Sequence, residues 1–195
     1  MEDQVDGNED YGDKLPVGFR FLPTDVELVT HYLINKVIYN PFSSFIFQEI
    51  NATELYTKSP KNFRSKPGRV VAGQCIIVQF CNGEREWFFF IYMDMNIDNM
   101  HNKAIEKGGD ELGFWQSIGD RKCVKDTNGN ILATKITFLY FSGSPSHRKK
   151  THWRIDEFRL PIQFYTLHNS KKIEGNNFTE WAAGRLARGR DYTSF

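Results

Sequence analysis

From residue 69 onward the sequence alternates short apolar runs with short polar turns, and this pattern restricts the fold to a sheet built from hairpins. Residues 74–80 and 86–92 are rich in aromatic and β-branched side chains, which favour strands over helices. Asn82-Gly83 between them is typical of a hairpin turn, and residues 126–130 resemble a second turn. Strands at such short intervals indicate an antiparallel sheet.

Further strands are expected where turn residues again separate short apolar runs. We predict strands at residues 114–118, 123–125, 131–133, 135–141 and 151–158, with a last one near residues 179–186. The polar, asparagine-rich residues 93–112 and the basic residues 142–150 are interpreted as loops.

Two helices are predicted before these strands. Thr24 and Glu27 fit a capping box that would start a helix over residues 25–37. Four apolar residues recur at helical spacing along this helix: Val26, Val29, Leu33 and Val37. Asn51 can cap a short second helix at residues 52–57. The fold class is therefore predicted to be α+β, an antiparallel sheet flanked by a few helices that are mainly N-terminal.

The net charge of +1 conceals an uneven distribution of acid and base. Six of the 24 acidic residues lie within residues 1–13, which contain no base, so the rest of the chain has 25 basic and 18 acidic residues, a net charge of +7. A basic body with an acidic tail is compatible with nucleic-acid binding. We expect residues 1–14 to be a disordered tail, residues 15–188 to form the folded domain and residues 189–195 to be a short C-terminal tail.

Several other classes of protein are not favoured. The phosphate-loop, dinucleotide, nucleophile-elbow and zinc-protease motifs are all missing, so we predict no enzyme and no cofactor, although a dispersed pair such as His152 and Asp156 could still be catalytic. Cys75, Cys81 and Cys123 have no metal-ligand spacing, and we expect no metal and buried free thiols. We also predict no membrane span and, from the acidic start, no signal peptide.

Residues 115–120 could contact DNA. Side chains alternate between the faces of a strand, so a buried Trp115 would turn Gln116 and Ile118 outward. In a major groove Gln116 could pair with an adenine edge and Ile118 could touch a thymine methyl group. The alternative is an ordinary surface strand with one exposed isoleucine.

Two further groups of residues could serve binding. The basic residues 147–150 could contact phosphates, or could be a solvated hairpin loop. Arg20 and Glu27 could form an ion pair within the chain or, reciprocally, between two chains of a dimer. Exposed pairs contribute only about 0–1 kcal/mol, so burial of Leu15, Val17 and Phe19 would have to supply the strength of a dimer.

Five ordered segments resemble the NAC-domain family of plant transcription factors. Residues 15–28 resemble its Leu-Pro-Pro-Gly-Phe-Arg-Phe-His-Pro-Thr-Asp-Glu-Glu-Leu opening, and residues 86–90 resemble Glu-Trp-Tyr-Phe-Phe. Residues 113–119 resemble Gly-Tyr-Trp-Lys-Ala-Thr-Gly, and residues 138–143 resemble Leu-Val-Phe-Tyr-Lys-Gly. Residues 150–160 resemble Lys-Thr-Asn-Trp-Ile-Met-His-Glu-Tyr-Arg-Leu.

The resemblance implies a twisted sheet, nuclear location, and dimerisation through the opening segment, as a homodimer or with other NAC proteins. It also implies regulation of transcription through double-stranded DNA, bound by a strand in the major groove. The implied DNA-binding residues are Lys103, Lys107, Gln116, Ser117, Ile118, Gly119, Arg121, Lys122, Arg148, Lys149 and Lys150. The implied dimer residues are Leu15, Pro16, Phe19, Arg20 and Glu27, and Trp115 and Trp153 are assigned to support the sheet.

This chain departs from the family pattern on the predicted groove strand. Gln116 and Ile118 stand where the family has Lys and Thr, and the family's next Lys is either replaced by Asp120 or deleted. Each lost phosphate contact would flatten the salt dependence of binding by about 0.9 units. An alternative function is therefore a dimerising interaction protein that lowers DNA binding or activation by full-length NAC relatives.

Overall fold

A computed structural model describes residues 21–39, 47–60, 86–96, 109–110, 113–168 and 177–189. The predicted acidic tail and the predicted strand at 74–80 with its Asn82-Gly83 turn lie outside these residues. Among the described residues, no helix is both long and apolar enough to cross a membrane.

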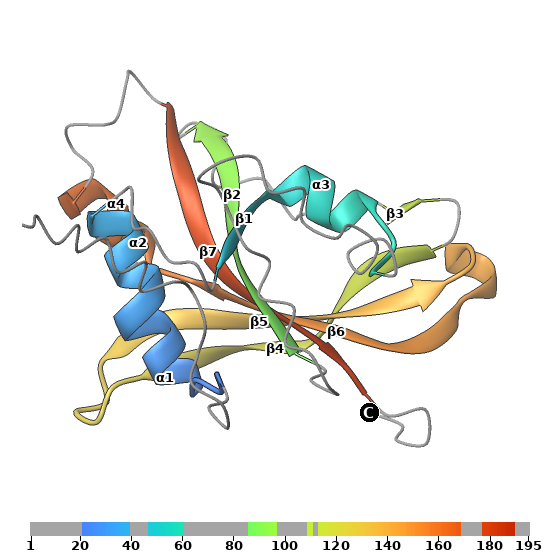
Figure 1. The fold of residues 1–195 in the computed structure, drawn as a ribbon, viewed down its shortest axis with the longest axis horizontal. Coiled ribbons are helices and arrows are strands. Elements are labelled where there is room, and N and C mark those ends of the chain that lie inside the picture. The colour runs from blue at the N-terminus through green and yellow to red at the C-terminus, as the bar shows by residue number, and fades with distance from the viewer. Residues whose placement is uncertain are drawn as a thin grey trace, which may run out of the picture.

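The described part of the chain forms one twisted sheet of seven strands (Figure 1). The strands are β1 (Gln48–Asn51), β2 (Glu86–Asn96), β3 (Gly109–Asp110), β4 (Gly113–Lys125), β5 (Ile131–Ser142), β6 (Lys149–Arg159) and β7 (Asn177–Arg188). Their order across the sheet is β1-β2-β7-β6-β5-β4-β3, and all neighbours are antiparallel except β1 and β2. The predicted α+β class is confirmed, with one parallel pair added at an edge.

The N-terminal helix is continuous through α1 (Asp25–Glu27), the π-helical turn η1 (Leu28–Leu33) and α2 (Ile34–Ile38). Its predicted capping box is confirmed, because the Thr24 hydroxyl accepts from the Glu27 backbone N–H and Glu27 accepts from the Thr24 backbone N–H. The buried apolar residues are Leu28, Val29, Leu33 and Val37. Val26, expected on this face, is instead 37% exposed.

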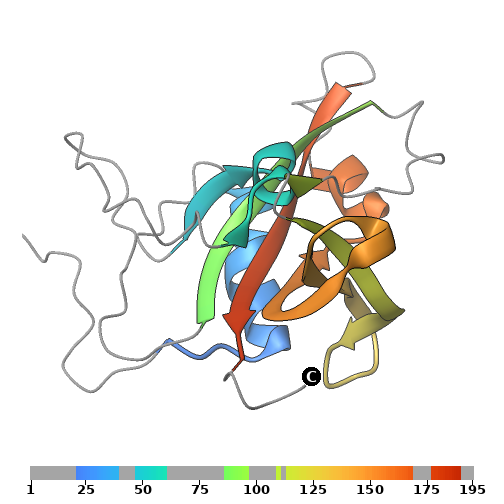
Figure 2. The same cartoon turned by 90° about the vertical axis from the view of Figure 1, so that its right-hand side faces the viewer.

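Both faces of the sheet are covered, which explains the unbroken apolar run in β2. Phe88 and Phe90 join the core beneath the N-terminal helix, whereas Phe89 and Ile91 join a second core with α3 (Ala52–Thr57). The cap of α3 is confirmed, since Asn51 Oδ1 accepts from the Thr53 backbone N–H. Figure 2 shows the twist of the sheet that lies between the N-terminal helix and α3.

A partly buried charged cluster connects the N-terminal helix to the middle of the sheet. The Asp25 carboxylate lies 2.8 Å from Lys135 Nζ on β5 and 2.9 Å from Arg185 Nη2 on β7. Arg185 Nη2 also lies 3.0 Å from the buried Asp156 carboxylate on β6. These contacts fix the position of α1 over the three central strands.

Several predicted element boundaries are corrected. The pairs 114–118 with 123–125, and 131–133 with 135–141, each form one long strand. The interval 93–112 contains the end of β2 and the short β3, and within 142–150 a 3-10 turn (η4, Pro145–His147) leads into β6. Helix α4 (Ile162–His168) was not predicted, so the helices are not confined to the N-terminal end.

Candidate nucleic-acid interface

Strand β4 forms an exposed edge of the described sheet. Along one side it pairs with β5, whereas on the other side β3 pairs only with Gly113 and Phe114. Among the described residues, no strand pairs with the rest of that side. All seven residues from Ser117 to Cys123 are exposed. An exposed edge with charged side chains is protected from pairing with other sheets and remains available to a different kind of partner.

The predicted inward position of Trp115 is confirmed. Its side chain is 2% exposed and packs edge-on against Tyr140 of β5, with ring centroids 5.2 Å apart. Because neighbouring side chains alternate, Gln116 and Ile118 point to the opposite face. Ile118 is 38% exposed, and Gln116 is half-buried.

Strand β4 is irregular directly after Ile118. The pairing with β5 shifts between Ile118 and Lys122, and Gly119 has φ of 64°. This left-handed conformation is easily adopted by glycine and costs other residues energy. The shift turns the strand and leaves Arg121 and Lys122 exposed beside Asp120.

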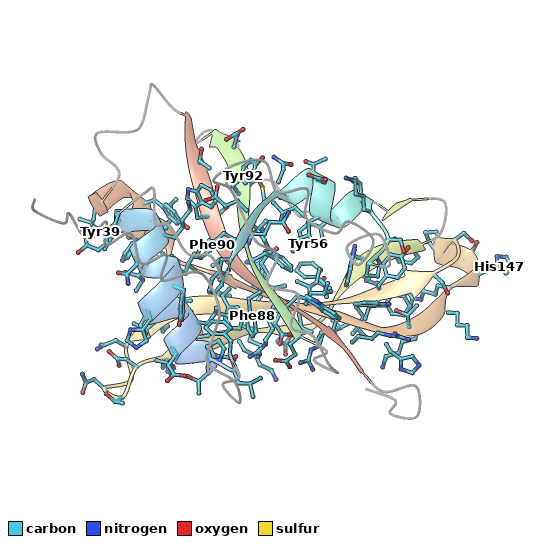
Figure 3. The ribbon with its side chains drawn as sticks, viewed as in Figure 1. Tyr39, Tyr56, Phe88, Phe90, Tyr92 and His147 are labelled. Atoms are coloured by element: carbon cyan, nitrogen blue, oxygen red, sulfur yellow. The ribbon has the colours of Figure 1, made fainter. Side chains whose placement is uncertain are left out.

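The hairpin between β5 and β6 supplies a second basic element next to β4. Arg148, Lys149 and Lys150 are exposed, and Figure 3 labels His147 at the tip of this hairpin. Arg148 Nη1 donates to Gln116 Oε1 at 2.6 Å. The hairpin cations and the Gln116 strand, 32 residues apart in sequence, are thus parts of one surface.

An aromatic pair underlies Arg148, and sequence reasoning did not identify it. Phe114 of β4 and Phe141 of β5 are cross-strand partners with ring centroids 5.8 Å apart. The Arg148 guanidinium lies 5.1 Å from the centroid of Phe141. Alternation places Phe114 on the same face as Gln116, but only the pairing register reveals the Phe141 contact.

The other predicted residues are placed as follows. Trp153 of β6 is buried, and its ring centroid lies 5.8 Å from that of Trp87. Glu27 is exposed, and hydrogen bonds from the Thr24 backbone N–H and hydroxyl lower the pKa of its carboxyl. Cys123 is exposed, not buried as expected, because it lies on the uncovered part of β4. The predicted residues outside the described ranges are Leu15, Pro16, Val17, Phe19, Arg20, Cys75, Cys81, Lys103 and Lys107.

The chemistry of this surface is that of a cationic, hydrogen-bonding ridge. No group of three or more metal-ligating side chains was found among the described residues. The surface carries amide, hydroxyl, guanidinium and ammonium groups, one exposed isoleucine and the carboxylate of Asp120. Its cationic and hydrogen-bonding groups suit recognition of a polyanion with polar edges.

Comparison with known proteins gives consistent matches. The profile of the No apical meristem (NAM) protein family matches residues 16–160. "Putative NAC domain-containing protein 94" of Arabidopsis thaliana is 30% identical over 185 residues, which cover 91% of this chain and 49% of the relative. "NAC transcription factor 25" of the same plant is 33% identical over 148 residues, covering 75% and 39%. "Protein CUP-SHAPED COTYLEDON 1" is 29% identical over 165 residues, covering 82% and 46%. This chain spans half or less of the length of these relatives.

Proposed function

This chain belongs to the NAM, or NAC-domain, family, and we propose that it binds double-stranded DNA sequence-specifically as a dimer and thereby regulates transcription. Family membership supports a transcription-factor role in the nucleus and not an enzymatic one. The observation that carries the proposal is the exposed edge of β4, with Trp115 buried behind it and cations on both sides.

The proposed binding mode places β4 in the major groove. This groove is about 12 Å wide and admits a two-stranded ribbon such as β4 with β5. Its bases would be met by Gln116, Ser117, Ile118 and Gly119. The phosphates would be met by Lys103, Lys107, Arg121, Lys122 and the hairpin residues Arg148, Lys149 and Lys150. Trp115 and Trp153 hold the sheet from behind.

Selection from a random DNA pool tests this function directly. We expect the purified chain to enrich a defined sequence, and mobility shifts of that sequence to weaken with salt. The slope of log affinity against log salt concentration should be about −0.9 for every phosphate neutralised. A pool that stays random after repeated rounds would contradict sequence-specific binding.

The proposed dimer uses residues 15–20 with Glu27. We expect Arg20→Glu to shift the protein towards monomer in light scattering, because it replaces attraction to Glu27 of the second chain by repulsion. Glu27→Gln is the matched variant: glutamine still serves a capping box, so the helix is kept while the charge is removed. Its effect should be up to about fivefold in dissociation constant for each of the two reciprocal ion pairs. An unchanged mass for Arg20→Glu would rule out the pairing.

The alternative function is favoured by one specific observation. Gln116 stands where the family pattern has a lysine, and the next lysine of that pattern is replaced by Asp120 or deleted, which lowers the positive charge of the groove strand. In this alternative function, the chain would dimerise with full-length relatives and reduce their DNA binding. A mobility-shift titration with a full-length relative separates the two functions, because an inhibitory subunit gives no specific complex alone and depletes the complex of its partner.

A further inference from the structure

The contact between Gln116 and Arg148 changes what this part of β4 can recognise. Arg148 Nη1 donates to Gln116 Oε1 at 2.6 Å, and the guanidinium also lies over the Phe141 ring. Phe141 is itself stacked on Phe114. The guanidinium is therefore held by a hydrogen bond on one side and an aromatic face on the other, at the level of Gln116.

The orientation of the Gln116 amide follows from this contact. A guanidinium has donors and no acceptor, so the group facing it must be the amide oxygen. Reading adenine requires that same oxygen to accept from adenine N6 while the amide nitrogen donates to N7. Oε1 has a second lone pair, but the Arg148 guanidinium 2.6 Å away competes for this oxygen and weakens its hydrogen bond to a further donor such as adenine N6. The adenine contact first expected for Gln116 is disfavoured by this geometry.

The combined surface of the two side chains is rich in donors. The Gln116 amide nitrogen and the remaining guanidinium N–H groups of Arg148 are all hydrogen-bond donors. In the major groove, guanine presents two neighbouring acceptors, N7 and O6, and arginine binds them with two parallel hydrogen bonds. Holding the guanidinium in place before binding also reduces the side-chain entropy lost on binding.

We propose that Arg148, first assigned to a phosphate, instead reads a guanine in the DNA site. Gln116, first assigned to a base, is then the positioning residue of Arg148. This inference rests on the proposed DNA-binding function and assigns the base recognised at that same surface. The cation that the family pattern carries on the strand, at position 116, is here supplied by the neighbouring hairpin.

The test is selection from a random DNA pool with the full chain and four variants. Wild type should enrich a motif that contains a guanine. Arg148→Met, which keeps an apolar stem, should reduce discrimination for guanine at one position of each half-site by roughly tenfold or more. Gln116→Met should weaken the same preference for guanine. Gln116→Glu should preserve this preference even if overall affinity falls, because a carboxylate also accepts a hydrogen bond from the guanidinium.

Lys149→Met is the matched control, because Lys149 is an exposed cation of the same hairpin with no side-chain contact to Gln116 among the described interactions. It should lower affinity for all sequences equally. If Arg148→Met behaves like Lys149→Met, the inference is wrong although DNA binding stands. The same holds if wild type selects adenine and the preference for guanine is unchanged in every variant. If wild type enriches no sequence, the proposed function itself fails.

Discussion

At the scale of single residues, Gly113 shows why the start of β4 tolerates no side chain. A Cβ at this position would lie 2.1 Å from the Phe141 carbonyl oxygen and 2.9 Å from the Tyr140 ring. Its φ of 159° is also one that residues with a Cβ rarely adopt, so both space and conformation favour glycine here. The same close approach of β4 and β5 brings Phe114 against Phe141 and thereby supports Arg148.

We expect Gly113→Ala to lower the free energy of unfolding by about 1–3 kcal/mol, because the obstructing atom belongs to the backbone and cannot rotate away. Urea denaturation measures this change. Ser117→Ala is the control in the same strand; it is exposed, and its effect should stay within about 0.5 kcal/mol. A similarly small effect of Gly113→Ala would mean that β4 can separate from β5 at little cost.

At the scale of elements, the first turn of the N-terminal helix has two separate contacts. Thr24 and Glu27 close the capping box, which satisfies backbone N–H groups that the helix leaves without partners. Asp25 instead points to the sheet, where it meets Lys135 and Arg185. The sequence pattern reveals the first contact, because it is local, and not the second.

Thr24→Ala is expected to destabilise the protein by about 1 kcal/mol, since it removes the hydroxyl that accepts from the Glu27 backbone N–H. Thermal unfolding provides the measurement. Thr53→Ala, at an exposed position of α3, should change stability far less. Equal midpoints for Thr24→Ala and wild type would show that sheet contacts alone hold the helix.

At the scale of the whole molecule, the buried Asp156 joins three strands and the N-terminal helix. Burial alone would raise the pKa of its carboxyl, but a hydrogen bond from Arg185, the charges of Arg154 and Lys135, and a hydrogen bond from Thr137 outweigh burial and lower it. A carboxyl whose pKa is lower in the folded protein stabilises the fold above its unfolded pKa of about 3.9. This contribution is lost as pH falls through the folded pKa.

Asp156→Asn should therefore reduce the free energy of unfolding by about 1–3 kcal/mol at pH 7, because the partly buried cations Lys135, Arg154 and Arg185 lose their charged partner. The difference from wild type should shrink as the pH is lowered from 5 towards 3. Chemical denaturation at several pH values measures it. Asp120→Asn removes an exposed carboxylate and should have little effect at any pH. A difference for Asp156→Asn that does not vary with pH would contradict the role of its charge.

Local features of the chain were predicted correctly because they depend on residues close in sequence. The capping box of Thr24 and Glu27 is set by residues three apart, and the turn at 126–130 closes on itself, with the Asp126 carboxylate accepting from the Asn128 and Asn130 backbone N–H groups. The alternation that buries Trp115 and exposes Ile118 follows from strand geometry. The family resemblance also rests on such short segments.

Features that depend on distant residues could be seen only after folding. The insertion of β7 between β2 and β6 and the parallel pairing of β1 with β2 have no local signal. The contact of Arg148 with Gln116 depends on the register of β4, β5 and β6 together. Such pairings are selected by the summed burial and hydrogen bonding of the whole sheet, which no short stretch of the chain contains.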